Sequence, residues 1–134
     1  MSRSEVMSRV KHRDTGPELR VRRHLWASGL RFRLASKGLV GKPDLVFPGK
    51  RLAIFVHGCF WHQHPGCPNA RMPKSRREFW QNKLLRNVER DAEVAAKLKV
   101  IGWGAMTIWE CETRNVEKLS ALTDAIKEWA RRNH

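Results

Sequence analysis

Three side chains able to bind a metal ion lie close together near the middle of the chain, Cys59, His64 and Cys67, in the spacing Cys-x4-His-x2-Cys. A tight loop can bring such thiolate and imidazole groups around one tetrahedral ion, and zinc favours these ligands. A closed structural site needs a fourth ligand, and Cys111 is the remaining cysteine. The segment around Cys111 must then return to this loop, which constrains the whole fold. The alternative is that the cysteines are buried and inert.

Charge narrows the class of partner. The chain of 134 residues carries 27 Lys and Arg against 13 Asp and Glu, a formal net charge of +14. Such a surplus attracts a polyanion, usually nucleic acid. We expect no membrane association, because we find no basic helix with a continuous apolar face and no apolar run of about 20 residues. The polar start of the sequence shows no signal peptide, so we expect a cytoplasmic location.

Length and patterning predict a single α/β domain, residues 15–134, preceded by a basic arm, residues 1–14. The strand predicted at 52–56 is apolar on both faces, which places it centrally in a mixed β-sheet flanked by helices. A turn at residues 48–51 predicts an antiparallel hairpin. The predicted helices are 15–28, 75–100 and 116–131, and the predicted strands are 30–34, 44–47, 52–56 and 105–109.

The long predicted helix has two features of its own. Ser75 and Glu78 have the spacing of a capping box at its start. Its apolar residues fall roughly on one side, which we expect to be buried. They are Phe79, Trp80, Leu84, Val88, Ala92, Ala95 and Leu98.

Asp44 begins one strand of the predicted hairpin, and Val56 ends the other. A hairpin of this length places the start of the first strand beside the end of the second. We therefore expect the Asp44 carboxylate and the Val56 backbone carbonyl to share a cation, and magnesium favours such oxygen ligands. The ion would polarise a phosphodiester and stabilise the leaving oxygen. The alternative is that Asp44 is a turn residue after proline.

Two histidines, His57 and His62, flank the first zinc ligand. A neutral histidine can act as a general base, especially when a carboxylate orients it. Asp91, in the long predicted helix, is the candidate for that carboxylate. Taken alone, Asp91 is better explained as a solvated helix charge, and Glu18 as a helix-capping residue.

Aromatic residues form the last group. Phe60 and Trp61 are adjacent in the predicted loop, so they cannot both point into one core. In a basic protein, exposed rings can stack on bases or wedge between them. The alternative is a small core around the loop, with Trp80 as a buried helix residue, and the pattern does not separate the two.

Several runs resemble the very-short-patch repair endonucleases, over residues 7–113. The runs His-Gly-Cys-Phe-Trp-His and Asn-Val-Glu-Arg-Asp are specific, and both occur here in the expected order. The matching residues are 43–44 (Pro-Asp), 56–62 (Val-His-Gly-Cys-Phe-Trp-His), 78–80 (Glu-Phe-Trp), 87–91 (Asn-Val-Glu-Arg-Asp) and 109–111 (Trp-Glu-Cys).

The resemblance implies a restriction-endonuclease-like fold with a structural zinc loop. It also implies a DNA repair enzyme of the bacterial cytoplasm or nucleoid. This enzyme would nick one DNA strand 5′ to the thymine of a T:G mismatch, the product of 5-methylcytosine deamination, in a magnesium-dependent reaction. We expect a monomer acting on double-stranded DNA, with other mismatch-repair proteins as candidate partners.

The resemblance also assigns roles. Asp44 and the Val56 carbonyl would bind magnesium, with Glu18 nearby. His62 would be the general base oriented by Asp91, and His57 would contact the scissile phosphate. The zinc ligands would be Cys59, His64, Cys67 and Cys111. The intercalating rings would be those of Phe60, Trp61 and Trp80.

Two other functions share part of this evidence from the residues. A restriction-like nuclease acting on undamaged DNA would use the same fold and the same acid. A non-catalytic, zinc-stabilised DNA-binding module would fit the charge and the zinc loop equally well. It would give Asp44, His62 and Asp91 no shared task.

Overall fold

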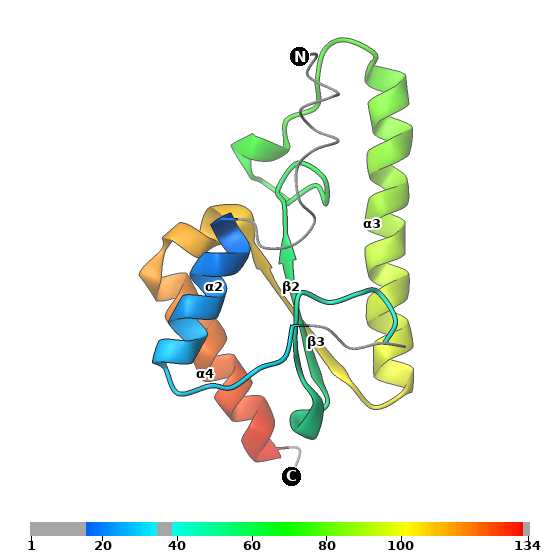
Figure 1. Ribbon diagram of the computed structural model, residues 1–134. Coiled ribbons are helices and arrows are strands. Elements are labelled where there is room, and N and C mark those ends of the chain that lie inside the picture. Colours follow the sequence, from blue (N-terminus) through cyan, green and yellow to red (C-terminus); the bar gives the residue numbers. More distant parts are fainter. Residues whose placement is uncertain (1–15, 35–38, 133–134) are drawn as a thin grey trace.

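The computed structural model describes residues 16–34 and 39–132, and it has three layers (Figure 1). Helices α2 and α4 cover one face of a central sheet, and α3 covers the other. The helices are α2 (Gly16–Ala27), α3 (Arg77–Val100) and α4 (Val116–Arg132), and the strands are β1 (Leu45–Phe47), β2 (Leu52–His57) and β3 (Gly104–Trp109). Three short 3-10 helices, η1 (Pro48–Lys50), η2 (Pro68–Ala70) and η3 (Glu110–Arg114), lie between them.

The sheet is mixed, in the order β1-β2-β3. Strand β1 pairs antiparallel with β2 from Leu45 opposite Ile54, which confirms the predicted hairpin. Strand β2 pairs parallel with β3, and the last pair in register is His57 with Trp109. A parallel pair needs a long crossover, and α3 supplies it. The two longer strands therefore end at the same edge of the sheet.

Strand β2 is central and covered on both faces, as its continuous apolar sequence predicted. Leu52 and Ile54 belong to the larger core, which is formed with α2 and α4. Ala53 and Phe55 belong to a smaller core that includes Leu98 of α3. The alternation follows from the pleat of a strand, which sends successive side chains to opposite faces.

The prediction of a strand at residues 30–34 is wrong. Arg33 alone makes an isolated bridge, with Val46 of β1. Arg31 donates hydrogen bonds to the carbonyls of Trp26 and Leu30, and these bonds hold the chain close to the end of α2. Leu34 is 38% exposed, so the segment has no continuous buried face that would keep it in the sheet.

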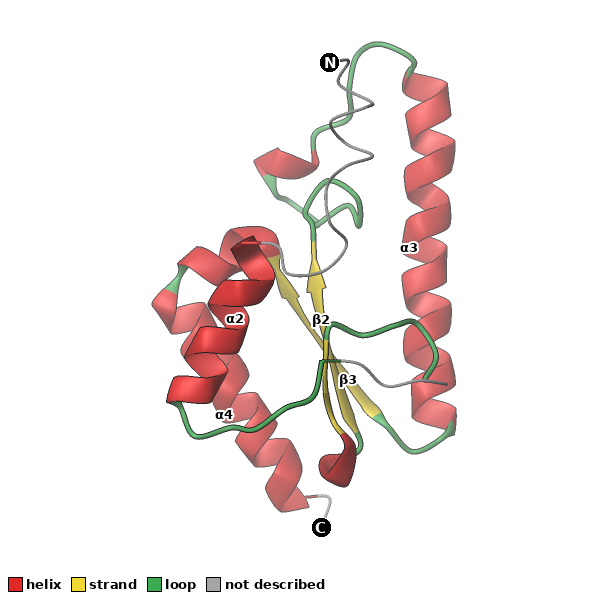
Figure 2. Cartoon of the chain, in the orientation of Figure 1, coloured by secondary structure: helices red, strands yellow, loops and turns green. Residues whose placement is uncertain are grey.

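Helix α3 differs from its prediction in two ways. Its N-cap residue is Arg76, in a left-handed conformation with φ of 54° and no side-chain capping bond, so the capping box at Ser75 is wrong. Its apolar side is only partly buried, because Leu84 and Leu98 are its buried residues. Phe79, Val88, Ala92 and Ala95 are exposed. For Phe79 and Val88 the reason is length: the first half of α3 extends beyond the sheet, beside the loop that follows β2 (Figure 2).

Some predictions fall elsewhere. The basic arm at 1–14 and the capping residue Thr15 lie outside the described residues. Within the described ranges, no helix combines the length and apolar character needed to cross a bilayer.

Close packing at the start of β3 provides a test of the fold. A Cβ atom added at Gly104 would lie 2.7 Å from the indole ring of Trp129. That ring is anchored, because its N–H donates a 2.7 Å hydrogen bond to the Lys50 carbonyl. We expect Gly104→Ala to lower the free energy of unfolding by about 1–3 kcal/mol in urea denaturation. Gly49→Ala is the control, since its Cβ would meet open space. Equal stability of the two variants would contradict this packing.

Candidate functional site

The loop after β2 is folded tightly on itself, and this sorts its side chains into different directions. The His62 N–H donates to the Gly58 carbonyl at 3.1 Å, and the His64 N–H donates to the Cys59 carbonyl at 2.9 Å. Gln63 has a positive φ of 51°, and its side-chain amide donates a 2.6 Å hydrogen bond to the Phe60 carbonyl. Consecutive side chains of the loop therefore point toward different groups of residues.

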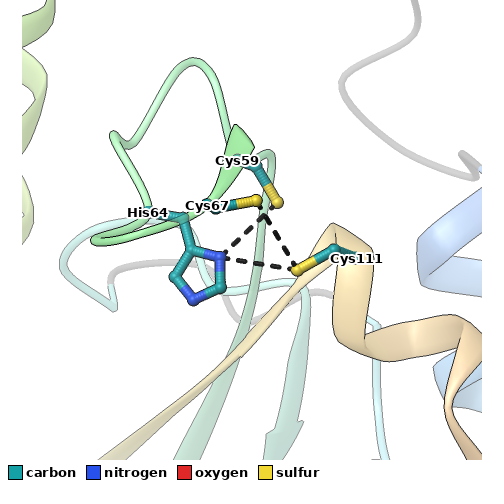
Figure 3. A group of neighbouring side chains, drawn as sticks. All are labelled: Cys59, His64, Cys67 and Cys111. Atoms are coloured by element: carbon teal, nitrogen blue, oxygen red, sulfur yellow. Dashed lines mark hydrogen bonds between the residues drawn. The ribbon is translucent and has the colours of Figure 1, made fainter. Parts of the chain in front are cut away.

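The first group is the predicted metal cluster, Cys59, His64, Cys67 and Cys111 (Figure 3). One potential ligand atom from each residue lies within 4.8 Å of the others. The His64 Nδ1 atom lies 3.8 Å from the Cys59 sulfur and 3.4 Å from the Cys111 sulfur. The Cys67 and Cys111 sulfurs are 3.9 Å apart. The predicted return of Cys111 to the loop is thus observed.

These separations fit a tetrahedral ion. With metal–sulfur bonds of about 2.3 Å, two sulfurs of a tetrahedron lie about 3.8 Å apart. All three cysteines are free, and burial together with Cys59 and Cys67 raises the pKa of Cys111 to about 12. Such crowded thiols become thiolates when a cation neutralises them, as binding to a metal ion does. The four residues can therefore hold a metal ion with no open coordination position.

The second group surrounds Asp44. The Val56 N–H donates a 2.7 Å hydrogen bond to its carboxylate, while the Asp44 N–H donates to the Ile54 carbonyl at 3.1 Å. Glu18 of α2 lies beside it, buried, and forms a 3.2 Å ion pair with Arg22. Burial raises the pKa of Asp44 to about 7, against the effect of the Val56 bond, and the neighbouring Glu18 raises it further.

This environment suits a cation. Desolvation and the neighbouring acid both disfavour the Asp44 anion, and a bound cation would reverse that preference. The N–H and C=O of one strand residue point to the same side, so the Val56 carbonyl faces the same edge as Asp44. The chain thus offers carboxylate and carbonyl oxygens together, which is the donor type that magnesium prefers.

The third group is His57, His62 and Asp91. His62 Nδ1 lies 2.6 Å from Asp91 Oδ2, a pairing that brings the loop onto α3. The rings of His57 and His62 are stacked, with centroids 3.8 Å apart and an interplanar angle of 5°. Burial lowers the pKa of His57 to about 4, and the charge of His62 lowers it further, against the effect of Asp91. Asp91 is therefore a partner of His62 and not an isolated helix charge.

The His62–Asp91 contact fixes the role of each ring nitrogen. An ionised carboxylate can only accept a hydrogen bond, so His62 donates from Nδ1. In the neutral ring, Nε2 then carries the lone pair and can accept a proton. The three residues line an open cavity of about 300 Å³, together with Val88, Thr107 and Trp109.

The fourth group is aromatic. Ring centroids of Phe60 and Trp61 are 5.1 Å apart, and Trp80 of α3 lies 5.5 Å from the first and 6.0 Å from the second. All three are half-buried, and none belongs to either core of the sheet. The Lys83 ammonium lies 5.9 Å from the Trp61 ring. The three rings therefore form an accessible, positively flanked cluster beside the metal loop.

Sequence reasoning missed several residues that support these groups. Arg22 pairs with Glu18, and the i, i+4 spacing on one helix was an available signal. Asn87 donates a 3.1 Å hydrogen bond to the Trp61 carbonyl, and Trp109 contacts both His57 and His64. Asn87 and Trp109 lie in runs that match the family, but their contacts join distant segments, so no local pattern assigned them a role.

The metal cluster predicts a loss of metal and of stability together. Cys111→Ser should remove most of the metal ion bound by the cluster, measured by elemental analysis of the purified protein. The melting temperature should fall by more than about 10 °C, because a structural ion contributes directly to folding. The neighbouring, exposed residue gives the control Glu110→Gln, which should keep its metal. Full metal content in Cys111→Ser would contradict the ligand set.

The raised pKa of Asp44 predicts that the stability of the folded state depends on pH. The folded state retains a proton up to about pH 7, while the unfolded chain loses it near pH 4, so stability without added divalent cation falls as pH rises across this window. Asp44→Asn cannot ionise and keeps an acceptor for Val56. We expect it to raise the melting temperature at pH 8 by about 3–8 °C, and by less at pH 5. The exposed-site variant Asp124→Asn should show no such pH dependence; equal gains for Asp44→Asn at both pH values would refute the argument.

Comparison with known proteins assigns the chain to a family. The family described as DNA mismatch endonuclease Vsr matches residues 1–69. The type II nicking enzyme V.XorIIP of Xanthomonas oryzae pv. oryzae is 44% identical over 119 residues, which are 89% of this chain and 87% of that protein. DNA mismatch endonuclease Vsr of Escherichia coli is 42% identical over 130 residues, 96% of this chain and 83% of that protein. The type II nicking enzyme V.NmeAIP of Neisseria meningitidis is 39% identical, over 94% of this chain and 92% of its own length. The chain therefore belongs to the Vsr family of DNA mismatch endonucleases.

Proposed function

We propose that the protein is a DNA repair endonuclease that nicks one strand 5′ to the thymine of a T:G mismatch. The observation that carries the proposal is the shared position of two groups at one strand end. Val56 bonds to Asp44, and the next residue, His57, stacks on His62. Adjacent residues, Val56 and His57, therefore link a site with oxygen ligands for a cation to an oriented base, His62. The names of the relatives, DNA mismatch endonuclease and nicking enzyme, agree with this function.

In this proposal His62 is the general base. The Asp91 carboxylate accepts a hydrogen bond from the Nδ1–H group, so the Nε2 atom is free to take a proton from the attacking water. The carboxylate also stabilises the imidazolium that forms. His57, whose lowered pKa keeps it neutral near pH 7, donates an N–H to a phosphate oxygen of the scissile bond.

Asp44 and the Val56 carbonyl would hold the catalytic magnesium, with Glu18 close to them. When bound, magnesium polarises the phosphodiester and stabilises the leaving oxygen. Asp44 thus supplies a charge that its surroundings disfavour in the absence of a cation. Arg22 keeps the second carboxylate oriented through its ion pair with Glu18.

Recognition of the mismatch falls to the aromatic cluster. Phe60, Trp61 and Trp80 would insert beside the mismatched pair, because a mispaired step is easier to unstack than a paired one. Basic side chains at the same end of α3 would contact the phosphates. Arg76 lies over the Phe79 ring at 4.3 Å, and the Lys83 ammonium lies 5.9 Å from each of the Phe79 and Trp61 rings.

Several structural expectations belong to the same proposal. The mixed sheet with an acid at the start of one strand would be a restriction-endonuclease-like core, in one domain over residues 15–134. Zinc would occupy the cluster of Cys59, His64, Cys67 and Cys111 and act structurally. The basic arm at 1–14 would embrace the duplex, and the enzyme would act as a monomer.

A nicking assay on short duplexes tests the function. Duplexes that carry T:G in varied flanking sequences are compared with fully paired duplexes, with and without magnesium. We expect magnesium-dependent cleavage of the thymine strand alone. Cleavage of both strands of paired DNA would favour the restriction-like nuclease, and absence of any turnover would favour the non-catalytic DNA-binding module.

Variants separate chemistry from recognition. His62→Ala should reduce the nicking rate by about 10²–10⁴-fold, the range of a general base, with little change in DNA affinity. Phe60→Leu should instead reduce the preference for T:G over paired DNA, measured as a ratio of kcat/KM values. Leu85→Ala, on an exposed part of α3 outside the cluster, is the control. A His62→Ala enzyme of wild-type rate would exclude the mechanism proposed here.

A further inference from the structure

A continuous row of rings joins the metal cluster to the His62–Asp91 pair. The ring of His64 stacks on Trp109, with centroids 4.3 Å apart and planes at 10°. Trp109 meets His57 edge to face at 5.3 Å and 73°. His57 then stacks on His62 at 3.8 Å and 5°. The row thus runs from a candidate zinc ligand to the proposed general base.

The strand register produces this row. Trp109 ends β3 directly opposite His57, which ends β2. Each of the two is followed two residues later by a cysteine of the cluster, Cys111 and Cys59 respectively. The backbone N–H of Trp109 also donates a 3.0 Å hydrogen bond to the Glu112 carboxylate, which fixes the backbone at the end of the strand. The indole at the end of β3 therefore contacts both His57, at the end of β2, and His64 of the cluster.

We infer that Trp109 is a positioning residue for His62, an inference that rests on the proposed function. Asp91 contacts the His62 ring at Nδ1 and leaves the ring free to tilt about that contact. The tilt is then set by whatever packs against the face of the ring. His57 packs against that face, and Trp109 supports His57 from the side. A misplacement of about 1 Å can reduce a rate by about 10²-fold. Trp109 accordingly conveys the position of the metal cluster to the base.

Substitution of the indole by a residue without a ring tests the inference. Trp109→Leu in the full chain should lower the single-turnover nicking rate by about 10–100-fold, with the Kd for T:G DNA changed less than about threefold. Trp109→Phe keeps a ring and should restore most of the rate. Trp103→Leu is the matched control. Trp103 directly precedes β3 and is also half-buried, but it packs against the smaller core. It should behave as wild type.

Two further measurements exclude a merely structural role. Zinc content should stay at the wild-type value in Trp109→Leu. The strongly deshielded proton between His62 and Asp91 should be sharp in the NMR spectra of wild type and Trp103→Leu and broadened in Trp109→Leu. Trp109→Met replaces the leucine variant if that variant does not fold. A wild-type rate, a rate loss accompanied by zinc loss, or an unchanged proton resonance would each overturn the inference.

The same experiment keeps the two proposals apart. If the wild-type protein nicks no mismatched duplex, the proposed function fails. The proton resonance needs no substrate, so it still reports whether Trp109 sets the position of His62. If the wild-type protein nicks and the resonance does not change in Trp109→Leu, the inference alone fails.

Discussion

The parallel pairing of β2 with β3 is the contact on which the other features depend. Its register ends both strands at one level, with His57 opposite Trp109. Cys59 and Cys111 follow at equal distances and reach the same cluster. A slip of one residue would turn every side chain of a strand to the opposite face. It would therefore separate the cysteines and remove His57 from the stack on His62 at the same time.

The acid directly before β1 shows a second constraint, a conflict between stability and chemistry. Asp44 is held next to Glu18 in a poorly solvated position that raises its pKa to about 7. A fold optimised for stability alone would place a neutral side chain there, since a buried charge without a counter-ion destabilises the folded state. The retained carboxylate is thus an indication of a cation-dependent role, of the kind expected at a functional site.

Much of the fold could be predicted because its signals are local. The hairpin, the central β2 and the helix from residue 116 follow from short apolar runs and turn residues, and the spacing of Cys59, His64 and Cys67 indicated a metal cluster. Segment 30–34 failed because alternation alone does not reveal that Arg31 bonds back to α2. Asp91 and Trp109 contact partners far away in the sequence, and these contacts depend on sheet register and helix placement, which local patterns do not contain.

Helix α3 rests on two different supports. Its last turns pack on the sheet through Leu98, whereas its first and middle turns contact the loop after β2 through Trp80, Asn87 and Asp91. That loop is folded by its own backbone hydrogen bonds and carries Cys59, His64 and Cys67 of the cluster that can hold a metal ion. A metal ion bound there would support these turns of the 24-residue helix, and its loss would free a surface that already exposes Phe79 and Leu85. Such surfaces attract proteases and chaperones, so the metal supply of a cell would govern how much of the protein survives as well as how much is active.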